Sequence, residues 1–453
     1  MKKALLLLGL LGLSLMAPVT AAADELVDMA QKLYPNDNVQ AINRPKSSLI
    51  IDGNTGDVLW QDNIDEIRDP ASMSKLMTLY LVFEAIKEGK ISEDTVITAT
   101  PQDQAIASIY EISNNKIRAG VDYTVAELIT MTAVPSSNAT TVMLANYLSD
   151  NDPDAFLDRM NAKAQELGMT NTLWFNASGA AAVSFKGYYN PQNYDNFASN
   201  QTTARDLGIL AYNFVKNYPG ILNYTNKAKV TVKEGTANEE TFETYNYSLP
   251  GAKYGIEGVD GLKTGSSPNG AFNYIATIKR GNQRMIAVIM GVGDWSDQDG
   301  EYYRHPFGNA LIEKAYADYE YKKMLPKGEQ EIDGQKYKLP EDFYATVKKG
   351  SKPKLKVEND VLRSENELTT LSDHVSDGMQ VEKVDQSITK AIQDVASGKN
   401  EGKAWYTLLI SDKLLILLPV GILLLILYFE YRSRKKREAM KQARRRRIDW
   451  EEE

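Results

Sequence analysis

The chain has 453 residues, of which 43% are hydrophobic and 25% charged, and its formal net charge is −8. These are ordinary globular values, so the composition excludes a mostly disordered chain and a protein with many membrane spans. Cysteine is absent, which excludes disulfides, thiolate metal sites and a cysteine nucleophile. The two histidines, His305 and His374, make a Ser-His-Asp triad a poor candidate. Any hydrolase here needs another general base, and we expect neither a metal nor a cofactor.

The first 23 residues have the pattern of a signal peptide. Lys2 and Lys3 precede the apolar run 4–16, and residues 21–23 are three alanines suited to cleavage. The apolar run is shorter than the ~20 residues needed to cross a membrane, so an uncleaved anchor is the weaker alternative. We therefore expect the chain that follows to be exported.

Hydrophobic periodicity predicts strands at both ends of the next 300 residues and helices between them. A β-hairpin is indicated by two apolar runs, 48–52 and 57–61, around the turn signal Asp52-Gly53-Asn54. The remaining predicted elements are helices over 72–87, 126–132, 139–148, 153–167 and 203–217, strands over 275–279 and 285–292, and a helix over 303–319.

The composition becomes polar and rich in charge from about Lys322 onward. Strand-like pieces at 344–347 and 355–357, with turn signals at Asp333-Gly334 and Lys349-Gly350, predict a small all-β domain. A polar stretch over 385–403 follows, and we interpret it as a stalk.

An uncharged apolar stretch, 414–429, predicts a single transmembrane span. An interfacial helix is the weaker alternative, because this stretch has no polar face. The tail 432–453 holds ten basic and five acidic residues, which is typical of a cytoplasmic flank; a nucleic-acid patch is the weaker alternative. The tail carries +5 and the signal peptide +2, so the exported part carries −15. This charge argues against nucleic acid as a partner. We expect a single-pass protein of the cell membrane, with its main part on the extracellular face.

The stretch Ser72-Met73-Ser74-Lys75 places a hydroxyl and an amine three residues apart, after Pro70-Ala71. Residues three apart lie on one helix face, so the Lys75 amine can reach the Ser72 hydroxyl. A nucleophilic serine needs an adjacent base, and a desolvated lysine with a lowered pKa can serve. By itself the spacing indicates little, because it recurs at four other serines: Ser113, Ser351, Ser387 and Ser433.

Two further stretches carry polar groups suited to a peptide ligand. Ser136-Ser137-Asn138 offers a hydroxyl that could relay a proton and an amide that could hold a carbonyl; a helix cap is the alternative. Lys263-Thr264-Gly265 offers a cation and a hydroxyl for a carboxylate, with a glycine that allows a close backbone approach. A β-turn is the alternative there, although this triplet occurs once in the chain.

In this order the three motifs resemble the penicillin-binding proteins, specifically the low-molecular-weight D-alanyl-D-alanine carboxypeptidases, which are known for S-x-x-K and K-T-G. The likeness covers roughly residues 40–300 and includes further matching stretches: Met160-Asn161, Leu167-Gly168-Met169, Asn176, Thr203-Ala204-Arg205-Asp206 and Gly258 to Gly265. The resemblance implies an α/β (α+β) serine DD-peptidase or β-lactamase-like catalytic domain, with a central antiparallel sheet flanked by helices. A small all-β domain and a C-terminal transmembrane anchor also fit that family's layout.

The resemblance implies three catalytic residues. Ser72 is the expected acylated nucleophile and Lys75 its proton acceptor, although the identity of the acylation base is disputed in related enzymes. Ser136 is expected to relay a proton to the leaving D-alanine. The expected reaction removes the terminal D-alanine from peptidoglycan stem peptides through an acyl-enzyme, and β-lactam antibiotics are expected to acylate the same serine.

The resemblance implies a second set of residues that bind substrate: Asn138, Lys263, Thr264, Gly265 and Ser266. Asn138 is expected to contact the peptide amide, and Lys263 and Thr264 the terminal carboxylate. The backbone N–H groups of Ser72 and Ser266 are expected to form the oxyanion hole. Two departures matter: Ser266 stands where some members have histidine, and no arginine lies shortly before the K-T-G strand. Carboxylate recognition is therefore expected to rest more heavily on Lys263 and Thr264.

The resulting prediction divides the chain into six parts: signal peptide 1–23, catalytic domain 24–320, small β domain 321–385, stalk 386–410, anchor 411–431 and cytoplasmic tail 432–453. Two alternative functions stay open. A class A-like β-lactamase needs a glutamate-activated water, yet residues 183–202 contain no glutamate and one acid, Asp195. A non-enzymatic cell-wall binding protein is disfavoured because all three motifs are intact.

Overall fold

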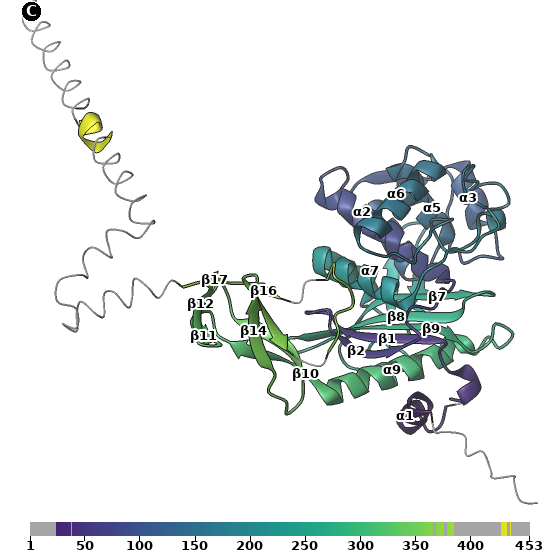
Figure 1. Cartoon of the computed structure of the whole chain (residues 1–453). Coiled ribbons are helices and arrows are strands. Elements are labelled where there is room, and N and C mark those ends of the chain that lie inside the picture. The colour runs from purple at the N-terminus through teal and green to yellow at the C-terminus, as the bar shows by residue number, and fades with distance from the viewer. Residues whose placement is uncertain are drawn as a thin grey trace, which may run out of the picture. The chain divides into compact units, whose positions relative to one another are not determined.

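The computed structural model describes residues 24–37, 39–365, 368–375, 378–384, 427–432 and 435. The chain divides into two units (Figure 1). The first contains residues up to 325 together with 342–379, and the second contains residues 326–341 and those from 380 onward. The candidate site lies wholly in the first unit.

A five-stranded antiparallel sheet forms the centre of the first unit, with strand order β2-β1-β9-β8-β7. Its strands are β1 (Ser47–Asp52), β2 (Val58–Asp62), β7 (Val259–Ser267), β8 (Ala271–Arg280) and β9 (Gln283–Val292). Strands far apart in sequence are neighbours in the sheet, because β9 returns to pair with β1. The strand β7 is left at one edge of the sheet, where it packs against the residues of η2 (Ala71–Ser74) and α8 (Leu222–Thr225).

Side chains of β9 alternate between two separate hydrophobic clusters, as the two-residue period of a strand requires. Met285, Ala287 and Ile289 pack on one face, whereas Ile286 and Val288 pack on the other. The first face is covered by α1 (Glu25–Leu33) and α9 (Gly300–Asp318), and the second by α7 (Ala204–Asn217) and the remaining helices (Figure 1). The predicted central antiparallel sheet flanked by helices is confirmed.

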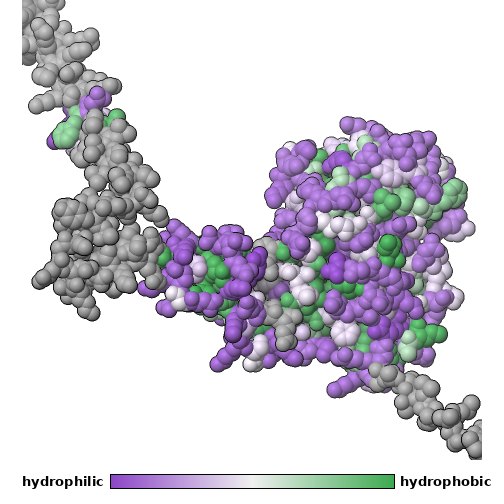
Figure 2. All heavy atoms as spheres, in the orientation of Figure 1, coloured by the Kyte–Doolittle hydropathy of each residue, from purple (hydrophilic) through white to green (hydrophobic). Residues whose placement is uncertain are grey.

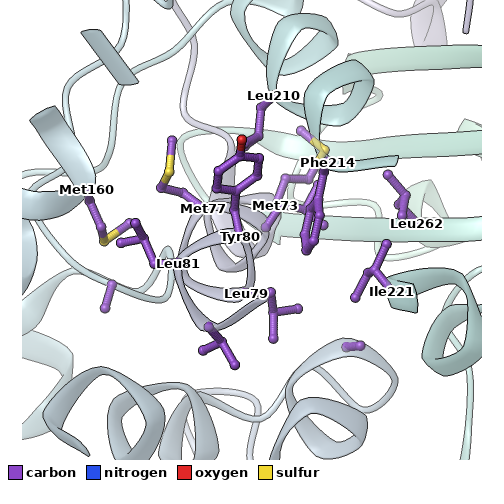
Figure 3. Packing of buried hydrophobic residues seen from close by; sticks show 14 of the residues in the cluster. Met73, Met77, Leu79, Tyr80, Leu81, Met160, Leu210, Phe214, Ile221 and Leu262 are labelled. Atoms are coloured by element: carbon purple, nitrogen blue, oxygen red, sulfur yellow. The ribbon is translucent and has the colours of Figure 1, made fainter. Parts of the chain in front are cut away.

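Helix α2 (Lys75–Lys87) is the core of the helical layer and is buried on almost every side. Figure 3 shows its side chains among those of neighbouring elements, including Met160 from α6 (Pro153–Glu166) and Leu210 and Phe214 from α7. The Tyr80 and Phe214 rings meet edge to face, with centroids 5.5 Å apart. The other helices here are α3 (Pro101–Ala107), α4 (Val125–Ala133), α5 (Asn138–Leu148), α6 (Pro153–Glu166) and α8 (Leu222–Thr225). A helix buried on all sides explains why its sequence is apolar without a polar face.

Short helical turns and hairpins complete this part of the first unit. The 3₁₀ turns are η1 (Ala41–Asn43), η2 (Ala71–Ser74), η3 (Ala182–Phe185) and η4 (Pro219–Ile221). Two small hairpins are formed by β3 (Val96–Thr98) with β4 (Asp122–Thr124) and by β5 (Lys229–Val232) with β6 (Glu240–Glu243). The predicted hairpin and helices are confirmed within a few residues, whereas α1 and α3 were not predicted.

The described residues between α9 and residue 384 form strands and turns without a helix, as predicted for this region. In the first unit, β10 (Tyr319–Leu325) pairs with β13 (Phe343–Lys348), and β14 (Lys354–Glu358) pairs with β15 (Val361–Glu365). In the second unit, β11 (Gly328–Ile332), β12 (Gln335–Leu339) and β17 (Glu382–Lys383) form one sheet. The two-residue strand β16 (Met379–Gln380) lies where the units join in sequence.

Residues 368–375 return from this β region to the core of the first unit. The Leu371 N–H donates to the Gly56 carbonyl at 3.0 Å, and the Arg205 guanidinium donates to the Leu371 carbonyl at 2.8 Å. Leu371 and Val375 are buried in the same hydrophobic cluster as α2. The cluster beneath α7 is therefore completed by residues from beyond β15.

Hydrophilic residues dominate the coloured surface in Figure 2, and the apolar patches on it are small and separate. The apolar side chains that gave the periodic pattern are gathered inside, in the two clusters on either side of the sheet. In the part of the chain that the structure describes, no helix is both long enough and apolar enough to span a membrane. The predicted signal peptide and stalk lie outside the described residues, as do the anchor and tail except for 427–432 and 435.

Candidate active site

Ser72 lies in the 3₁₀ turn η2, immediately before α2 begins at Lys75. The sequence predicted a helix from Ser72, and the difference is small in effect because side chains three residues apart eclipse one another in a 3₁₀ turn. Ala71 has a φ of +48°, which is costly for a residue with a side chain and needs support from its surroundings. Ser72 itself is partly exposed, so its hydroxyl faces the accessible side of the turn.

Asp69 supplies that support. Its carboxylate accepts a hydrogen bond from the Ala71 N–H at 2.8 Å and another from the Ser267 hydroxyl at 2.8 Å. Its carbonyl accepts from the Asn273 side chain at 3.1 Å. Burial raises the pKa of Asp69, and these donors oppose that shift by favouring the ionised form. Asp69 thereby ties the nucleophile turn to the β7–β8 hairpin.

Lys75 is fully buried, and its amine lies among three oxygen atoms. The Nζ atom is 2.9 Å from Ser72 Oγ, 2.8 Å from Asn138 Oδ1 and 2.8 Å from the Ser178 carbonyl oxygen. Burial lowers the pKa of Lys75 well below its usual value, and the charge of Lys263 lowers it further. A neutral amine has a lone pair, so at this distance it can accept the Ser72 hydroxyl proton.

The two serines of the second motif, Ser136 and Ser137, have different environments at the start of α5. Ser137 is the N-cap, since its hydroxyl accepts from the Thr140 N–H, so the capping alternative holds for this residue. Ser136 has a φ of +62°, and its hydroxyl is buried with no hydrogen-bond partner among the described residues. A strained backbone and an unsatisfied buried hydroxyl both cost free energy. Ser136 is therefore the serine of this motif that is available to a ligand.

Asn138 is held at both ends of its side-chain amide. Its Oδ1 accepts from Lys75, and its Nδ2 donates to the Ser113 carbonyl at 2.9 Å. Its backbone N–H donates to the same carbonyl at 2.8 Å. The loop that carries Ser113 thus fixes Asn138, and Asn138 helps to fix the Lys75 amine.

The K-T-G motif lies on β7, the edge strand of the sheet, and not in a turn. A Cβ atom added at Gly265 would lie 2.5 Å from the Pro70 carbonyl oxygen and 3.0 Å from the Ser72 nitrogen. The glycine is therefore required because the strand passes directly against the backbone of the nucleophile turn. Lys263 and Thr264 are both buried beside it.

Lys263 is nearly as buried as Lys75, and its Nζ donates to the Thr264 carbonyl at 3.0 Å. Burial, together with the charge of Arg304, lowers the pKa of Lys263 to about 7, against the opposing effect of Glu301. Two buried amines, Lys75 and Lys263, thus share one site, which favours an anionic ligand.

The segment after α6 forms the wall on the other side of the nucleophile turn. A Cβ at Gly179 would lie 1.9 Å from the Ala71 carbonyl oxygen, and the φ of Gly179 is +93°. The Asn176 side chain accepts from the Gly179 N–H at 2.6 Å, and the Asn200 side chain donates to Ser74 Oγ at 2.9 Å. Asn176 was part of the sequence likeness, and the structure shows that it shapes the wall.

Ser266, next after K-T-G, contacts two residues of α9 that the sequence did not reveal. Its hydroxyl donates to Glu301 Oε1 at 2.6 Å and accepts from Arg304 Nη1 at 2.9 Å. Arg304 also donates to Glu301 and to the Asn273 carbonyl. An arginine thus lies beside the end of the K-T-G strand, although it belongs to a helix and stands 38 residues further along the chain than Ser266.

All eight predicted site residues lie in one region around the η2 turn and the edge of the sheet. Within the described ranges, no group of three or more His, Asp or Glu side chains is arranged to hold a metal ion. The chemistry of the site rests on hydroxyls, two buried amines and backbone N–H groups.

A sequence model of the D-alanyl-D-alanine carboxypeptidase family matches residues 36–294 of this chain, which is more than half of it. The chain belongs to the D-alanyl-D-alanine carboxypeptidase family. A second model, of a domain of unknown function called DUF1958, matches residues 321–382.

Two curated relatives illustrate this membership. D-alanyl-D-alanine carboxypeptidase DacF of Bacillus subtilis is 28% identical over 275 residues, covering 61% of this chain and 63% of that protein. DacA of Haemophilus influenzae is 27% identical over 325 residues, covering 68% of this chain and 73% of that protein. The first alignment thus spans less than two thirds of the relative's own length.

Solved structures share the fold. A crystal structure described as a peptidoglycan synthesis regulatory factor (PBP3) from Streptococcus pneumoniae has a TM-score of 0.65, with 23% identity, and covers 76% of this chain and 99% of that one. Penicillin binding protein 5 from Haemophilus influenzae has a TM-score of 0.59, with 22% identity, and covers 76% of this chain and 98% of that one. The serine DD-peptidase fold predicted from the sequence is confirmed.

The two lysines predict a bell-shaped pH dependence for this carboxypeptidase family member. Lys75 is expected to act when neutral, so kcat/KM is expected to fall as the pH decreases through its lowered pKa. Lys263 is expected to bind the substrate carboxylate when protonated, so KM is expected to rise as the pH increases through about 7. A pH series of kcat and KM for a D-Ala-D-Ala peptide tests both limbs, and a KM that stays constant from pH 6 to 9 would contradict the role of Lys263.

Proposed function

We propose that this protein is a serine D-alanyl-D-alanine carboxypeptidase that removes the terminal D-alanine from peptidoglycan stem peptides. The observation that carries the proposal is the fully buried Lys75 amine, 2.9 Å from the Ser72 hydroxyl and with a strongly lowered pKa. A serine activated in this way is a nucleophile for acyl transfer, and family membership names the acyl group.

The first half of the proposed reaction forms an acyl-enzyme. Ser72 Oγ attacks the carbonyl carbon of the bond between the two D-alanines, and its proton passes to neutral Lys75. Backbone N–H groups of Ser72 and Ser266 stabilise the oxyanion of the tetrahedral intermediate. The C–N bond then breaks, and the proton on Lys75 passes through the Ser136 hydroxyl to the leaving D-alanine amine, which returns Lys75 to its neutral form. Its buried, unpaired hydroxyl suits that relay.

The second half hydrolyses the ester. A water molecule gives a proton to Lys75 and attacks the acyl carbon, and Ser72 regains its proton as the C–O bond breaks. The product is the stem peptide shortened by one residue, and Lys75 is neutral again. No group beyond those named is required for the atoms and protons to balance.

Substrate orientation is proposed to come from the two sides of the site. The terminal carboxylate binds to Lys263 and Thr264 on β7, and Gly265 allows the substrate backbone to run beside the strand. The Asn138 amide is engaged by Lys75 and Ser113, so its first role is to position Lys75. A contact of Asn138 with the peptide amide would use the second lone pair of its oxygen.

The experiment that tests this function combines a peptide and a β-lactam. We expect purified protein to release D-alanine from a peptide ending in D-Ala-D-Ala, and a fluorescent penicillin to form a stable adduct that maps to Ser72. Rapid turnover of penicillin would support a β-lactamase instead, and an absence of both labelling and D-alanine release would support a binding protein.

We also infer a single-pass location in the cell membrane, with the catalytic unit on the extracellular face. The inference rests on the apolar stretch 414–429 and the ten basic residues after it. A chain truncated before Trp405 is expected to be secreted and active, because every site residue lies far upstream of that position. Retention of the truncated chain on membranes, or protection of the full chain from protease added outside intact cells, would contradict this location.

A further inference from the structure

A small cluster of polar and charged side chains joins the end of β7 to α9. It consists of Ser266 from β7 and of Glu301 and Arg304 from α9. The Ser266 hydroxyl donates to one oxygen of Glu301 at 2.6 Å, and Arg304 donates to the other. A second nitrogen of Arg304 donates to Ser266 Oγ at 2.9 Å. The three side chains therefore close a ring of hydrogen bonds, which we call the Ser266 ring.

Exposure differs sharply across the Ser266 ring. The Arg304 side chain is 0% exposed, whereas that of Glu301 is 28% exposed. A buried guanidinium needs an anion beside it, because an unpaired buried charge is strongly destabilising. Glu301 meets this need from the solvent side, so its carboxylate can move into water when another anion pairs with Arg304, whereas the Arg304 guanidinium stays buried.

The same carboxylate acts on the residue that is proposed to bind the substrate. Arg304 lowers the pKa of Lys263 and Glu301 raises it, so the charges of both side chains act on the Lys263 amine. In the free protein Glu301 thus offsets part of the positive charge of Arg304 and Lys263. The terminal carboxylate of a substrate would bring a second negative charge to the same cations.

We propose that Glu301 is a resident counter-ion that the substrate's terminal carboxylate must displace from the Ser266 ring. When the carboxylate binds, Glu301 releases the Ser266 hydroxyl, which then donates to the substrate. Arg304 then pairs with both the substrate carboxylate and Glu301. Glu301 is therefore a specificity-determining residue: it offsets part of the buried positive charge between turnovers and weakens the binding of every ligand that carries a carboxylate at this position. The inference rests on the proposed function, which supplies that ligand.

The test compares an acid with an amide. The probes are an N-acylated peptide ending in D-Ala-D-Ala and the same peptide with a C-terminal carboxamide, titrated into protein carrying Ser72→Ala so that no turnover occurs. Adding Glu301→Gln removes the charge and keeps the shape. We expect the acid to bind about three- to tenfold more tightly, which is roughly 0.7 to 1.4 kcal/mol, and the amide to bind unchanged.

A matched control lies on the same helix. Glu313 also pairs with an arginine, since the Arg280 guanidinium donates to both of its oxygens at 2.9 and 2.5 Å. Arg280 also donates to the Glu257 carbonyl and lies over the Tyr316 ring, at the C-terminal end of β8. Glu313→Gln is expected to leave the binding of both probes unchanged. An equal tightening in this control would show a non-specific effect of net charge and would overturn the proposal.

Two results with Glu301→Gln would also overturn it: acid binding that is unchanged or weaker in the folded variant, or an equal change for acid and amide. If Glu301→Gln does not fold because Arg304 is left unpaired, Glu301→Asp carries the test. Aspartate keeps the charge but is one methylene too short to hold Ser266, so the acid is expected to bind about twofold more tightly, and no change would refute the idea. Failure of the wild type to release D-alanine would instead refute the proposed function.

Discussion

Ser72→Ala is expected to abolish D-alanine release, with a loss of about 10⁴-fold or more in kcat/KM, and to abolish labelling by fluorescent penicillin. The reason is that every covalent step of the proposed reaction passes through the Ser72 hydroxyl, and no other described group is placed against Lys75 as a nucleophile. The measurement is D-alanine release together with mass mapping of the adduct.

The fold is expected to survive this change. Ser72 is partly exposed, and the loss of its hydroxyl leaves Lys75 with two other oxygen partners, Asn138 and Ser178. The free energy of unfolding is therefore expected to change by about 0.5 kcal/mol or less. Ser351→Ala is a matched control, because Ser351 begins another S-x-x-K and lies in an exposed turn. Labelling that survives Ser72→Ala, or an adduct found at Ser113, would contradict the assignment.

Local sequence signals predicted the elements that carry the site. The hairpin of β1 and β2, the helix after Pro70 and the strands β8 and β9 follow from periodicity and turn residues within short windows. The contact between Ser72 and Lys75 was predictable for the same reason, because three residues of helical or 3₁₀ backbone bring the two side chains together.

Contacts between distant segments were not predictable from one sequence. Arg304 reaches Ser266 because α9 packs under the sheet, and no local pattern distinguishes it from any other helical arginine. Asp69 also depends on tertiary contact, since its partner Ser267 is 198 residues away. The same holds for Gly179, whose lack of a side chain matters because the wall segment passes within contact distance of Ala71.

The expectation that carboxylate recognition rests mainly on Lys263 and Thr264 stays a prediction. It was based on the absence of arginine just before the K-T-G strand, and that absence is real. The structure nevertheless places the Arg304 guanidinium against the residue that follows K-T-G. Which groups a charged side chain can contact depends on its place in the fold, and its place in the sequence does not reveal this.

Lys75→Arg is expected to reduce the rate of acylation by about 10²- to 10⁴-fold, the range typical of a lost general base. Arginine keeps its proton at any working pH, so it cannot accept one from Ser72. The guanidinium is also larger than the amine, and overpacking a fully buried position costs about 1–3 kcal/mol of stability. Single-turnover labelling with penicillin measures the acylation rate without the later steps.

A second readout separates the loss of the base from a simple distortion of the site. In the wild type, acylation is expected to slow as the pH falls through the lowered pKa of Lys75. In Lys75→Arg no group titrates at that position, so the residual rate is expected to lose this acid limb, whereas a merely misplaced nucleophile would keep it. Lys75→Met, which removes the amine without adding bulk at its end, is expected to give the same flat profile. Acylation by Lys75→Arg within about tenfold of wild type, roughly 1.4 kcal/mol of barrier, would show that Lys75 is not the base.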